Sequence, residues 1–203
     1  MWKVIAAVVA LLLLACGGVV ALGSYGGFEY WRLAQVESEV AVADARLAEA
    51  EAAAEQRRNA ACEEGQFAYA AKDYGRAVDR LDECIELDPG NATALLARGK
   101  SYAQLERFER AEADIDRAAA IDGSNAETWK ALAWVRVRLS DDPGAVAAAD
   151  RWVALEPNEA AAYQLRADAA YRQGLVELAV RDATRACDLG LEEGCALKAR
   201  MRR

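Results

Sequence analysis

The chain has 203 residues, of which 54% are apolar, three are prolines and none is histidine, and its formal net charge is −8. This composition, with almost no strand-like alternation, predicts an all-α fold. The negative charge argues against nucleic-acid binding, which needs a basic surface. The absence of histidine removes the commonest general base and metal ligand.

The first twenty-seven residues are interpreted as a membrane anchor. Segment 4–23 holds twenty residues without a charge, and as a helix it would be about 30 Å long, which matches the hydrocarbon core of a bilayer. Lys3 precedes the segment, whereas mostly acidic residues such as Glu29 and Glu37 come after it. The positive-inside rule then places the N-terminus in the cytoplasm and the remaining chain outside, on the periplasmic side of a bacterial inner membrane.

Two forms of anchoring remain open. One is a single-pass helix that is retained in the mature protein. The other is a lipoprotein signal, because Leu13-Leu14-Ala15-Cys16 resembles a lipobox in which Cys16 would be acylated after cleavage. The bulky Leu14 and the apolar run that continues to Leu22 favour the retained anchor over the lipoprotein.

Residues 28–57 are expected to form a helical stalk, within a helical pattern that runs from Phe28 to about Ala71. Its apolar residues are spaced by steps of three and four, as in a heptad seam. They are Leu33, Val36, Val40, Ala43, Leu47, Ala50 and Ala54. Either this stalk is a short coiled coil that makes the protein a homo-oligomer, or it is a single helix whose apolar stripe packs against the first repeat of the array beyond it.

Residues 58–193 repeat with a period of thirty-four, in four copies that span 58–91, 92–125, 126–159 and 160–193. Small residues recur in register, which lets paired helices approach closely. The eighth place of the copies holds Gly65, Gly99, Ala133 and Ala167, and the twentieth holds Ala77, Ala111, Ala145 and Ala179. A fixed period of this size predicts a solenoid of stacked helix pairs.

The stretch from Tyr74-Gly75-Arg76-Ala77 to Leu87-Asp88-Pro89 resembles the second helix of a tetratricopeptide repeat. The resemblance implies an α-α superhelical solenoid of four helix pairs, closed by a capping helix over residues 194–203. The chain departs from the family at the usually large and apolar seventh place. That place holds Glu64, Arg98, Leu132 and Arg166, so leaner packing between helices is expected. Asp142, just before Pro143, is expected to cap the second helix of the third copy.

Four cysteines lie outside the predicted membrane segment, a number that suits two disulfides in an oxidising compartment. Antiparallel packing of one helix pair would bring Cys62 and Cys84 to the same level, so a disulfide can form there. The segment from Cys187 to Cys195 resembles the bridged turn of Hcp-type cysteine-rich solenoid proteins, which implies a disulfide between them. The alternative for each cysteine is a small buried apolar residue. No histidine or third thiol accompanies them, so no zinc site is expected.

The sequence contains no catalytic triad, phosphate-binding loop or metal-ligand cluster, so we expect neither an enzyme nor a cofactor. The tetratricopeptide resemblance instead implies a groove lined by the first helix of each pair. Its expected lining is Tyr69, Lys100, Gln104, Lys130, Trp134, Arg138, Asp168, Tyr171 and Arg172. The lysines and arginines would make this face basic, and Trp134 and Tyr171 would anchor a partner.

These features predict a scaffold or adaptor that holds a partner polypeptide in its groove, in envelope assembly or secretion. The partner segment would carry acidic together with aromatic or aliphatic residues. The alternative function is a structural homo-oligomer assembled through the stalk.

Overall fold

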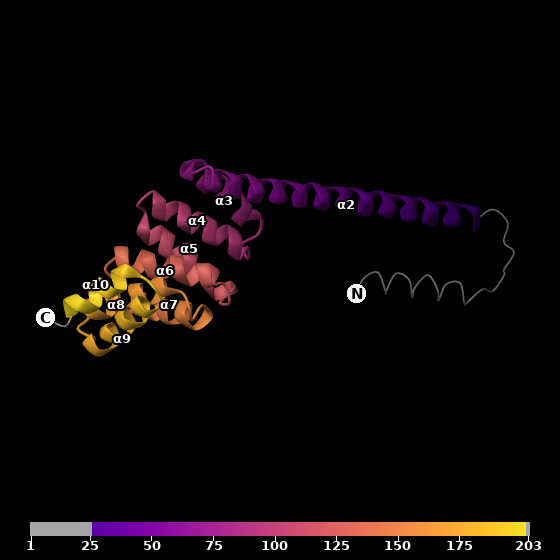
Figure 1. Cartoon of the computed structure of the whole chain (residues 1–203). Coiled ribbons are helices and arrows are strands. Elements are labelled where there is room, and N and C mark those ends of the chain that lie inside the picture. The colour runs from indigo at the N-terminus through magenta and orange to yellow at the C-terminus, as the bar shows by residue number, and fades with distance from the viewer. Residues whose placement is uncertain (1–25, 202–203) are drawn as a thin grey trace, which may run out of the picture. The chain divides into compact units, whose positions relative to one another are not determined.

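The computed structural model describes residues 26–201, and every regular element in that range is a helix (Figure 1). The helices are α2 (Gly26–Ala70), α3 (Tyr74–Leu87), α4 (Ala92–Gln104), α5 (Phe108–Ile121), α6 (Ala126–Arg138), α7 (Asp142–Leu155), α8 (Ala160–Arg172), α9 (Val176–Asp188) and α10 (Glu192–Met201). The prediction of an all-α fold is therefore confirmed for this part of the chain.

The predicted membrane segment 4–23, which includes Cys16, lies outside the described residues. Within residues 26–201, no helix combines the length and the apolar character needed to cross a membrane.

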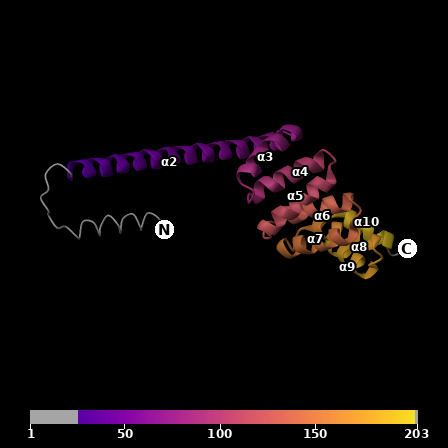
Figure 2. The ribbon, with the colours of Figure 1, turned by 180° about the vertical axis from the view of Figure 1, so that it is seen from behind.

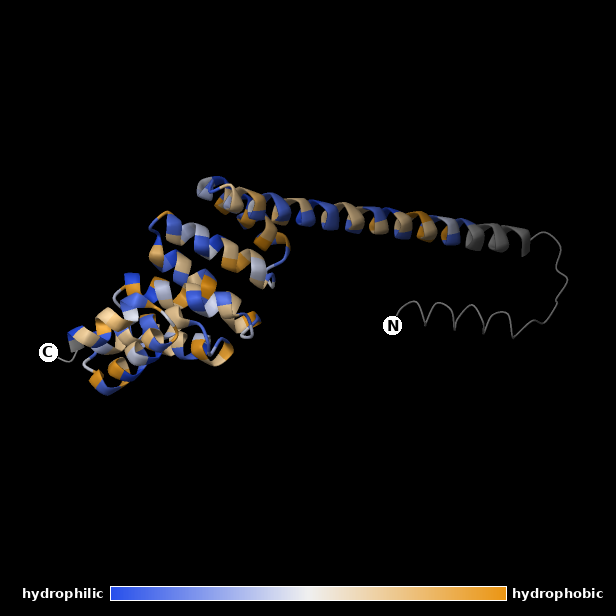
Figure 3. Ribbon diagram, in the orientation of Figure 1, coloured by the Kyte–Doolittle hydropathy of each residue, from blue (hydrophilic) through white to orange (hydrophobic). Residues whose placement is uncertain are grey.

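The chain divides into two compact units, residues 1–53 and 54–203. In the first unit, every α2 residue from Gln35 onward is exposed, including the apolar stripe residues Val36, Val40 and Leu47 at 53%, 54% and 59%. Figure 3 shows hydrophilic and hydrophobic residues alternating along this part of α2.

The second unit is a stack of helix pairs. The helices α4, α6 and α8 begin at Ala92, Ala126 and Ala160, 34 residues apart, and α3, α5, α7 and α9 keep the same interval. Each helix packs on the next one in the chain from α3 to α10. Figures 1 and 2, from opposite sides, both show these helices arranged one after another in a row.

Each pair turns through the same backbone geometry. The chain has a positive φ just after the first helix in all four repeats. The residues concerned are Lys72, Glu106, Ser140 and Gly174, with φ of 63°, 59°, 61° and 77°. Only the last is glycine, although an L side chain in this region costs roughly 1–2 kcal/mol. The turn therefore keeps the same backbone conformation in all four repeats, although three of them lack the glycine that this conformation favours.

Side chains just before several of the helices cap their N-termini, and one of these caps differs from our prediction. Asn91 and Asn125 cap α4 and α6 with their side-chain oxygens. The second helix of the third repeat is capped by Asp141, whose carboxylate accepts a hydrogen bond from the Gly144 amide. Our expectation that Asp142 is the cap was wrong, because Asp142 already lies inside α7, where it pairs with Arg172 at 2.7 Å.

Small residues at the eighth place allow close helix pairing, as the sequence predicts. An added Cβ at Gly65 would lie 2.6 Å from Cγ of Leu81, and one at Gly99 would lie 2.6 Å from Cγ1 of Ile115. The two side chains occupying that space, Leu81 and Ile115, are fully buried. The core is therefore built around these two contacts.

The seventh place, where leaner packing was expected, carries an ionic clamp in two of the repeats. Arg98 donates two hydrogen bonds of 2.7 Å to Asp114 on its own pair and one of 2.6 Å to Asp82 on the preceding pair. The Asp114 carboxylate, aided by Asp82, raises the pKa of Arg98 above its ordinary value although burial lowers it. The same clamp recurs 68 residues further on, in Arg166, Asp182 and Asp150.

The third repeat carries apolar residues in place of this clamp. Leu132 stands at the seventh place of the third repeat, and Ala148 stands where Asp114 stands in the second; both are buried. In the first repeat the charges are exchanged, with Arg80 3.1 Å from Glu64. The seventh place and the facing place on the second helix are therefore matched in every repeat: they hold either an ion pair or two apolar residues.

Two disulfides are present, between Cys62 and Cys84 and between Cys187 and Cys195, with Cα–Cα distances of 4.9 and 4.6 Å. The first joins α2 to α3 within the first repeat. The second joins α9 to α10 across a short turn and fixes α10 on the last repeat. Helix α10 begins at Glu192, two residues before the expected start of the cap.

Candidate functional site

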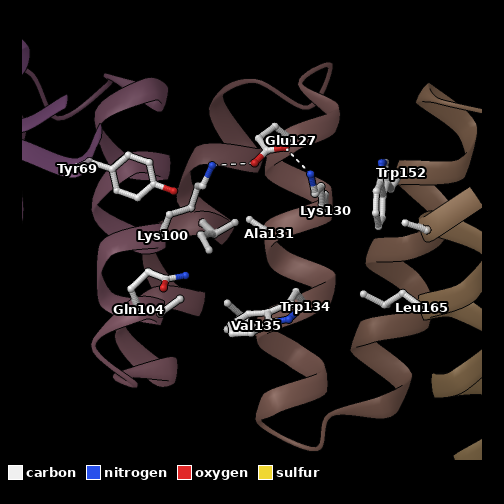
Figure 4. A pocket seen from close by; sticks show the side chains of 13 residues that line it. Tyr69, Lys100, Gln104, Glu127, Lys130, Ala131, Trp134, Val135, Trp152 and Leu165 are labelled. Atoms are coloured by element: carbon white, nitrogen blue, oxygen red, sulfur yellow. Dashed lines mark hydrogen bonds and ion pairs between the residues drawn. The ribbon is translucent and has the colours of Figure 1, made fainter. Parts of the chain in front are cut away.

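A cavity of about 370 Å³ opens on the face formed by α4, α6 and α8 (Figure 4). Five of the nine residues predicted to line a groove lie around it, namely Tyr69, Lys100, Gln104, Lys130 and Trp134. They come from the first helices of three successive repeats, which the 34-residue period places side by side.

The floor of this cavity is apolar. Ile115 and Val135 are buried beneath it, and Trp152 is only 3% exposed, with its indole N–H donating to Glu156 at 2.9 Å. Trp134 remains 40% exposed and packs edge-on against Phe108, with ring centroids 6.0 Å apart. A ligand side chain entering here would replace water on the exposed indole of Trp134 and pack above the buried Trp152.

A chain of polar contacts forms one edge of the cavity. Nζ of Lys100 lies 5.2 Å from the centre of the Tyr69 ring and donates to Glu127 at 2.7 Å. The same carboxylate lies 3.3 Å from Nζ of Lys130, which in turn lies 5.9 Å from the Trp152 ring. Figure 4 shows Tyr69, Lys100, Glu127 and Lys130 in this order along the edge.

The pKa shifts agree with a paired arrangement. Burial acts to raise the pKa of Glu127, but Lys100 and Lys130 outweigh it and the pKa falls below its ordinary value. Burial acts to lower the pKa of Lys100, but Glu127 and Tyr69 outweigh it and the pKa rises. Glu127 and Lys100 therefore keep their charges near neutral pH.

The expectation of an openly basic groove needs correction. Lys100 and Lys130 share the Glu127 carboxylate, and Arg172 is paired with Asp142 at 2.7 Å. Arg138 stacks over two aromatic rings instead, 4.6 Å from Phe108 and 5.3 Å from Trp134. The basic residues are thus engaged by internal acids or rings, and the apolar floor becomes the main feature of the site.

Eight of the thirteen residues around the cavity were missing from the sequence prediction, and Glu127 and Trp152 are the two that contribute most to its character. Glu127 stands at the second place of its repeat, near the start of α6. Trp152 stands on a second helix, where the equivalent residues are Cys84, Ala118 and Ala186, all nearly or fully buried. One large residue among small ones at the same place is the signal that could have revealed Trp152.

The other predicted groove residues lie further along the array. Asp168 and Arg172 line a second cavity of about 290 Å³ with Val137, Gln164, Leu191 and Glu193, and it shares Ala161 and Leu165 with the first. The two cavities are therefore neighbours along the array. Tyr171 is 40% exposed and lies outside both linings, with Arg200 over its ring. Within residues 26–201, no cluster of three potential ligands could hold a metal ion.

Stacked helix pairs of fixed length, with small residues at the crossing points and a groove along the first helices, define a helical-repeat protein. Residues 68–135 match the sequence profile of the tetratricopeptide repeat. This match identifies tetratricopeptide repeats in that part of the chain.

Comparison with known proteins gives one partial sequence relative and several structures of the same fold. The heat-shock protein cognate co-chaperone sgt12 of Aspergillus fumigatus is 28% identical over 95 residues, which is 47% of this chain but only 28% of that protein. The crystal structure of MamA matches with a TM-score of 0.64 at 18% identity, over 72% of this chain and 86% of MamA. YrrB, described as a TPR protein with an unusual peptide-binding site, matches with a TM-score of 0.61 at 21% identity, over 64% and 67%. At these identities the two structures show a shared fold.

Proposed function

We propose that this protein is a binding scaffold that holds a segment of a partner polypeptide along the groove, with a bulky apolar side chain inserted beside Trp134 and Trp152. The observation that carries the proposal is the open cavity of about 370 Å³ with an apolar floor and an exposed indole. Concave apolar sites with a few polar groups at the edge are the usual form of ligand sites, and tryptophan dominates the energy of many interfaces.

The polar edge defines which partners fit. An acidic residue of a partner has to displace Glu127 from Lys100 and Lys130, so its net gain is small. An aromatic or aliphatic side chain meets no such competitor on the floor. We therefore expect the apolar residue to determine affinity, and the acidic residue to make a smaller contribution.

Location outside the cytoplasm is part of the same proposal. The charge-free segment 4–23 supports a membrane anchor, and the two disulfides suit an oxidising compartment. A role in envelope assembly or secretion would suit that placement.

The second candidate function is a homo-oligomer formed through α2. It is supported by the exposed apolar stripe that includes Val36, Val40 and Leu47, which has heptad spacing and is not covered by any described residue of its own unit. Charged substitutions at Val40 and Leu47 would abolish such an oligomer, as sedimentation velocity would show.

Peptide selection tests the groove. The purified full chain is used to enrich ligands from a random peptide display library, and the dissociation constants of synthetic copies are then measured for the wild type, Trp134→Ala and Tyr171→Ala. Tyr171 is the matched control, because it is as exposed as Trp134 but lies outside both cavities.

We expect enriched peptides to share an aromatic or large aliphatic residue. Trp134→Ala should weaken the binding of these peptides at least roughly tenfold, and Tyr171→Ala should weaken it less than about threefold. Failure to enrich any peptide, or equal loss in both variants, would show that the cavity is not the binding site.

A further inference from the structure

The first helix of each repeat has one face that packs on the preceding repeat. The seventh place identifies this face, because Arg98 reaches back to Asp82 on α3. The third and tenth places lie on the same side of the helix. In repeats two to four these places are at most 2% exposed, and they hold Ala94, Thr128 and Ala162 at the third place and Ser101, Val135 and Ala169 at the tenth.

The first repeat leaves the same face uncovered. Its equivalent residues on α2 are Ala60, Glu64 and Phe67, which we name the N-terminal end face. All three are exposed, and Phe67 reaches 72%. The residues from Gly26 to Ala60 continue the same helix, so that part of the chain supplies no preceding helix pair. An aromatic side chain this exposed, at a place buried in every other copy, marks an interaction surface.

The opposite end of the array is also uncovered. Helix α10 takes the position of a further first helix, with Gly194 and Leu197 buried. Counted from the start of its helix, Ala199 corresponds to Gly99, Ala133 and Ala167, which are all buried. Gly99 lies against Ile115 on the second helix of its own pair, so Ala199 stands where α10 would receive a second helix. Ala199 itself is exposed, as are Ala196 and Arg200 beside it. We name Ala196, Ala199 and Arg200 the C-terminal end face.

The two end faces complement each other. Phe67 is large, whereas Ala196 and Ala199 are small and leave room for it. Glu64 is 49% exposed with Arg80 at 3.1 Å. Arg200 is 64% exposed, 3.9 Å from Asp168 and 5.7 Å from the centre of the Tyr171 ring. Opposite charges and opposite sizes therefore stand at the two ends of one array. Pairing two N-terminal end faces about a two-fold axis through their middle would instead oppose Glu64 to its own copy.

We propose that the N-terminal end face of one molecule binds the C-terminal end face of a second copy, so that α2 of one copy takes the place of a second helix beside α10 of the other. The contact is head to tail and uses different surfaces on the two partners, which allows chains of more than two molecules. None of the residues of the two end faces lines either of the cavities described above.

Two blocked variants test this arrangement. Phe67→Asp blocks binding at the N-terminal end face, and Ala199→Glu blocks binding at the C-terminal end face. Each variant keeps the other face intact. Both are made in the full chain carrying Val40→Glu and Leu47→Glu, so that association through α2 does not contribute. Sedimentation velocity is measured for each variant alone and for an equal mixture, with far-UV circular dichroism to confirm folding.

The unblocked background should form a concentration-dependent series of oligomers, and each blocked variant alone should be monomeric. Their mixture should form dimers and nothing larger, because only one intact pair of faces remains. A contact between two identical faces would not be restored by mixing. A monomeric background, or a mixture that stays monomeric, would overturn the proposal.

Charge exchange supplies a second measurement. Glu64→Arg and Arg200→Glu should each weaken assembly severalfold, and the double variant should recover it. If the double variant weakens association by the product of the two single fold-changes, the residues do not contact each other.

Discussion

The carboxylate of Glu127 on α6 lies 2.7 Å from Nζ of Lys100 on α4, at the edge of the tryptophan cavity. It also lies 3.3 Å from Nζ of Lys130. One acid thus engages both lysines of the groove, and any acidic partner must compete with a carboxylate that is already in place. This arrangement leads to a prediction about specificity.

Glu127→Gln should strengthen the binding of acidic peptides. The substitution keeps the side-chain shape but leaves two lysines without a carboxylate, so an acidic residue beside the apolar anchor should gain about fivefold, or roughly 1 kcal/mol for partly exposed charges. Dissociation constants for a peptide and for its Asp-to-Asn analogue measure the effect. The neutral analogue is the control and should bind both proteins alike; an equal change for both peptides would refute the explanation.

The same ion pair should be insensitive to pH across the neutral range. The pKa of Glu127 lies below its ordinary value of 4.5, so the stabilisation is complete above that value and is lost as the pH falls through the folded pKa. The pKa of Lys100 lies above its ordinary value of 10.5, so its contribution is present below that value and is lost as the pH rises through the folded pKa. Melting temperatures of the wild type and Glu127→Gln should differ by a constant amount from about pH 5 to 9 and converge below about pH 4. A difference that already varies between about pH 6 and 8 would contradict this assignment.

The helix pairs and their close contacts could be predicted because their signals are local and repeated. Gly65 and Gly99 stand at one place of a fixed period, and a missing side chain at that place has a direct structural meaning. The same regularity locates five cavity residues, since the first helices of successive repeats lie side by side.

The charge pairing of the groove could not be predicted in the same way. Lys100 and Glu127 are 27 residues apart on different helices, and whether they meet depends on the rotation of each helix within the stack. Arg98 also stands at a place that is usually apolar, and its character alone does not show that it reaches Asp114, 16 residues later. Side-chain partners at such separations become visible only in the folded array.

Two glycines of the first repeat should respond in opposite ways to alanine. Gly65→Ala places a Cβ 2.6 Å from Cγ of Leu81 and 3.2 Å from its backbone nitrogen, and such overpacking costs about 1–3 kcal/mol. Gly75→Ala meets nothing within 4 Å near the start of α3, and it should stabilise the protein by up to about 1 kcal/mol. Urea unfolding of both variants measures the difference. Equal effects on stability would mean that the helices do not approach closely at Gly65.

The disulfide that closes the longer segment of chain should contribute slightly more to stability. Cys62 and Cys84 are 22 residues apart, and Cys187 and Cys195 are 8 apart. In the chain-entropy model, replacing the first pair by alanine costs about 3 kcal/mol and replacing the second costs about 2–3 kcal/mol. Urea unfolding with and without reductant tests both pairs. Reductant should lower the unfolding free energy of the wild type through both disulfides, and that of each variant only through the disulfide that it retains. A wild type whose stability is unchanged by reductant would contradict the assignment.

The ionic clamp provides the sharpest test of packing, because the chain contains its own control. Arg98→Leu removes the partner of Asp114, whose side chain is 7% exposed, and an unpaired buried charge costs about 3–5 kcal/mol. The third repeat shows the apolar solution, with Leu132 and Ala148 at the same two places. Arg98→Leu combined with Asp114→Ala should therefore recover stability to within about 1–2 kcal/mol of the wild type.

Urea unfolding of the two single variants and the double variant gives the coupling energy. Matching substitutions at Arg166 and Asp182 should repeat the pattern, because the same clamp is present there. A double variant whose loss equals the sum of the single losses would show that Arg98 and Asp114 act independently. Recovery in both repeats would establish that the seventh place accepts either an ion pair or an apolar pair, provided that both members change together.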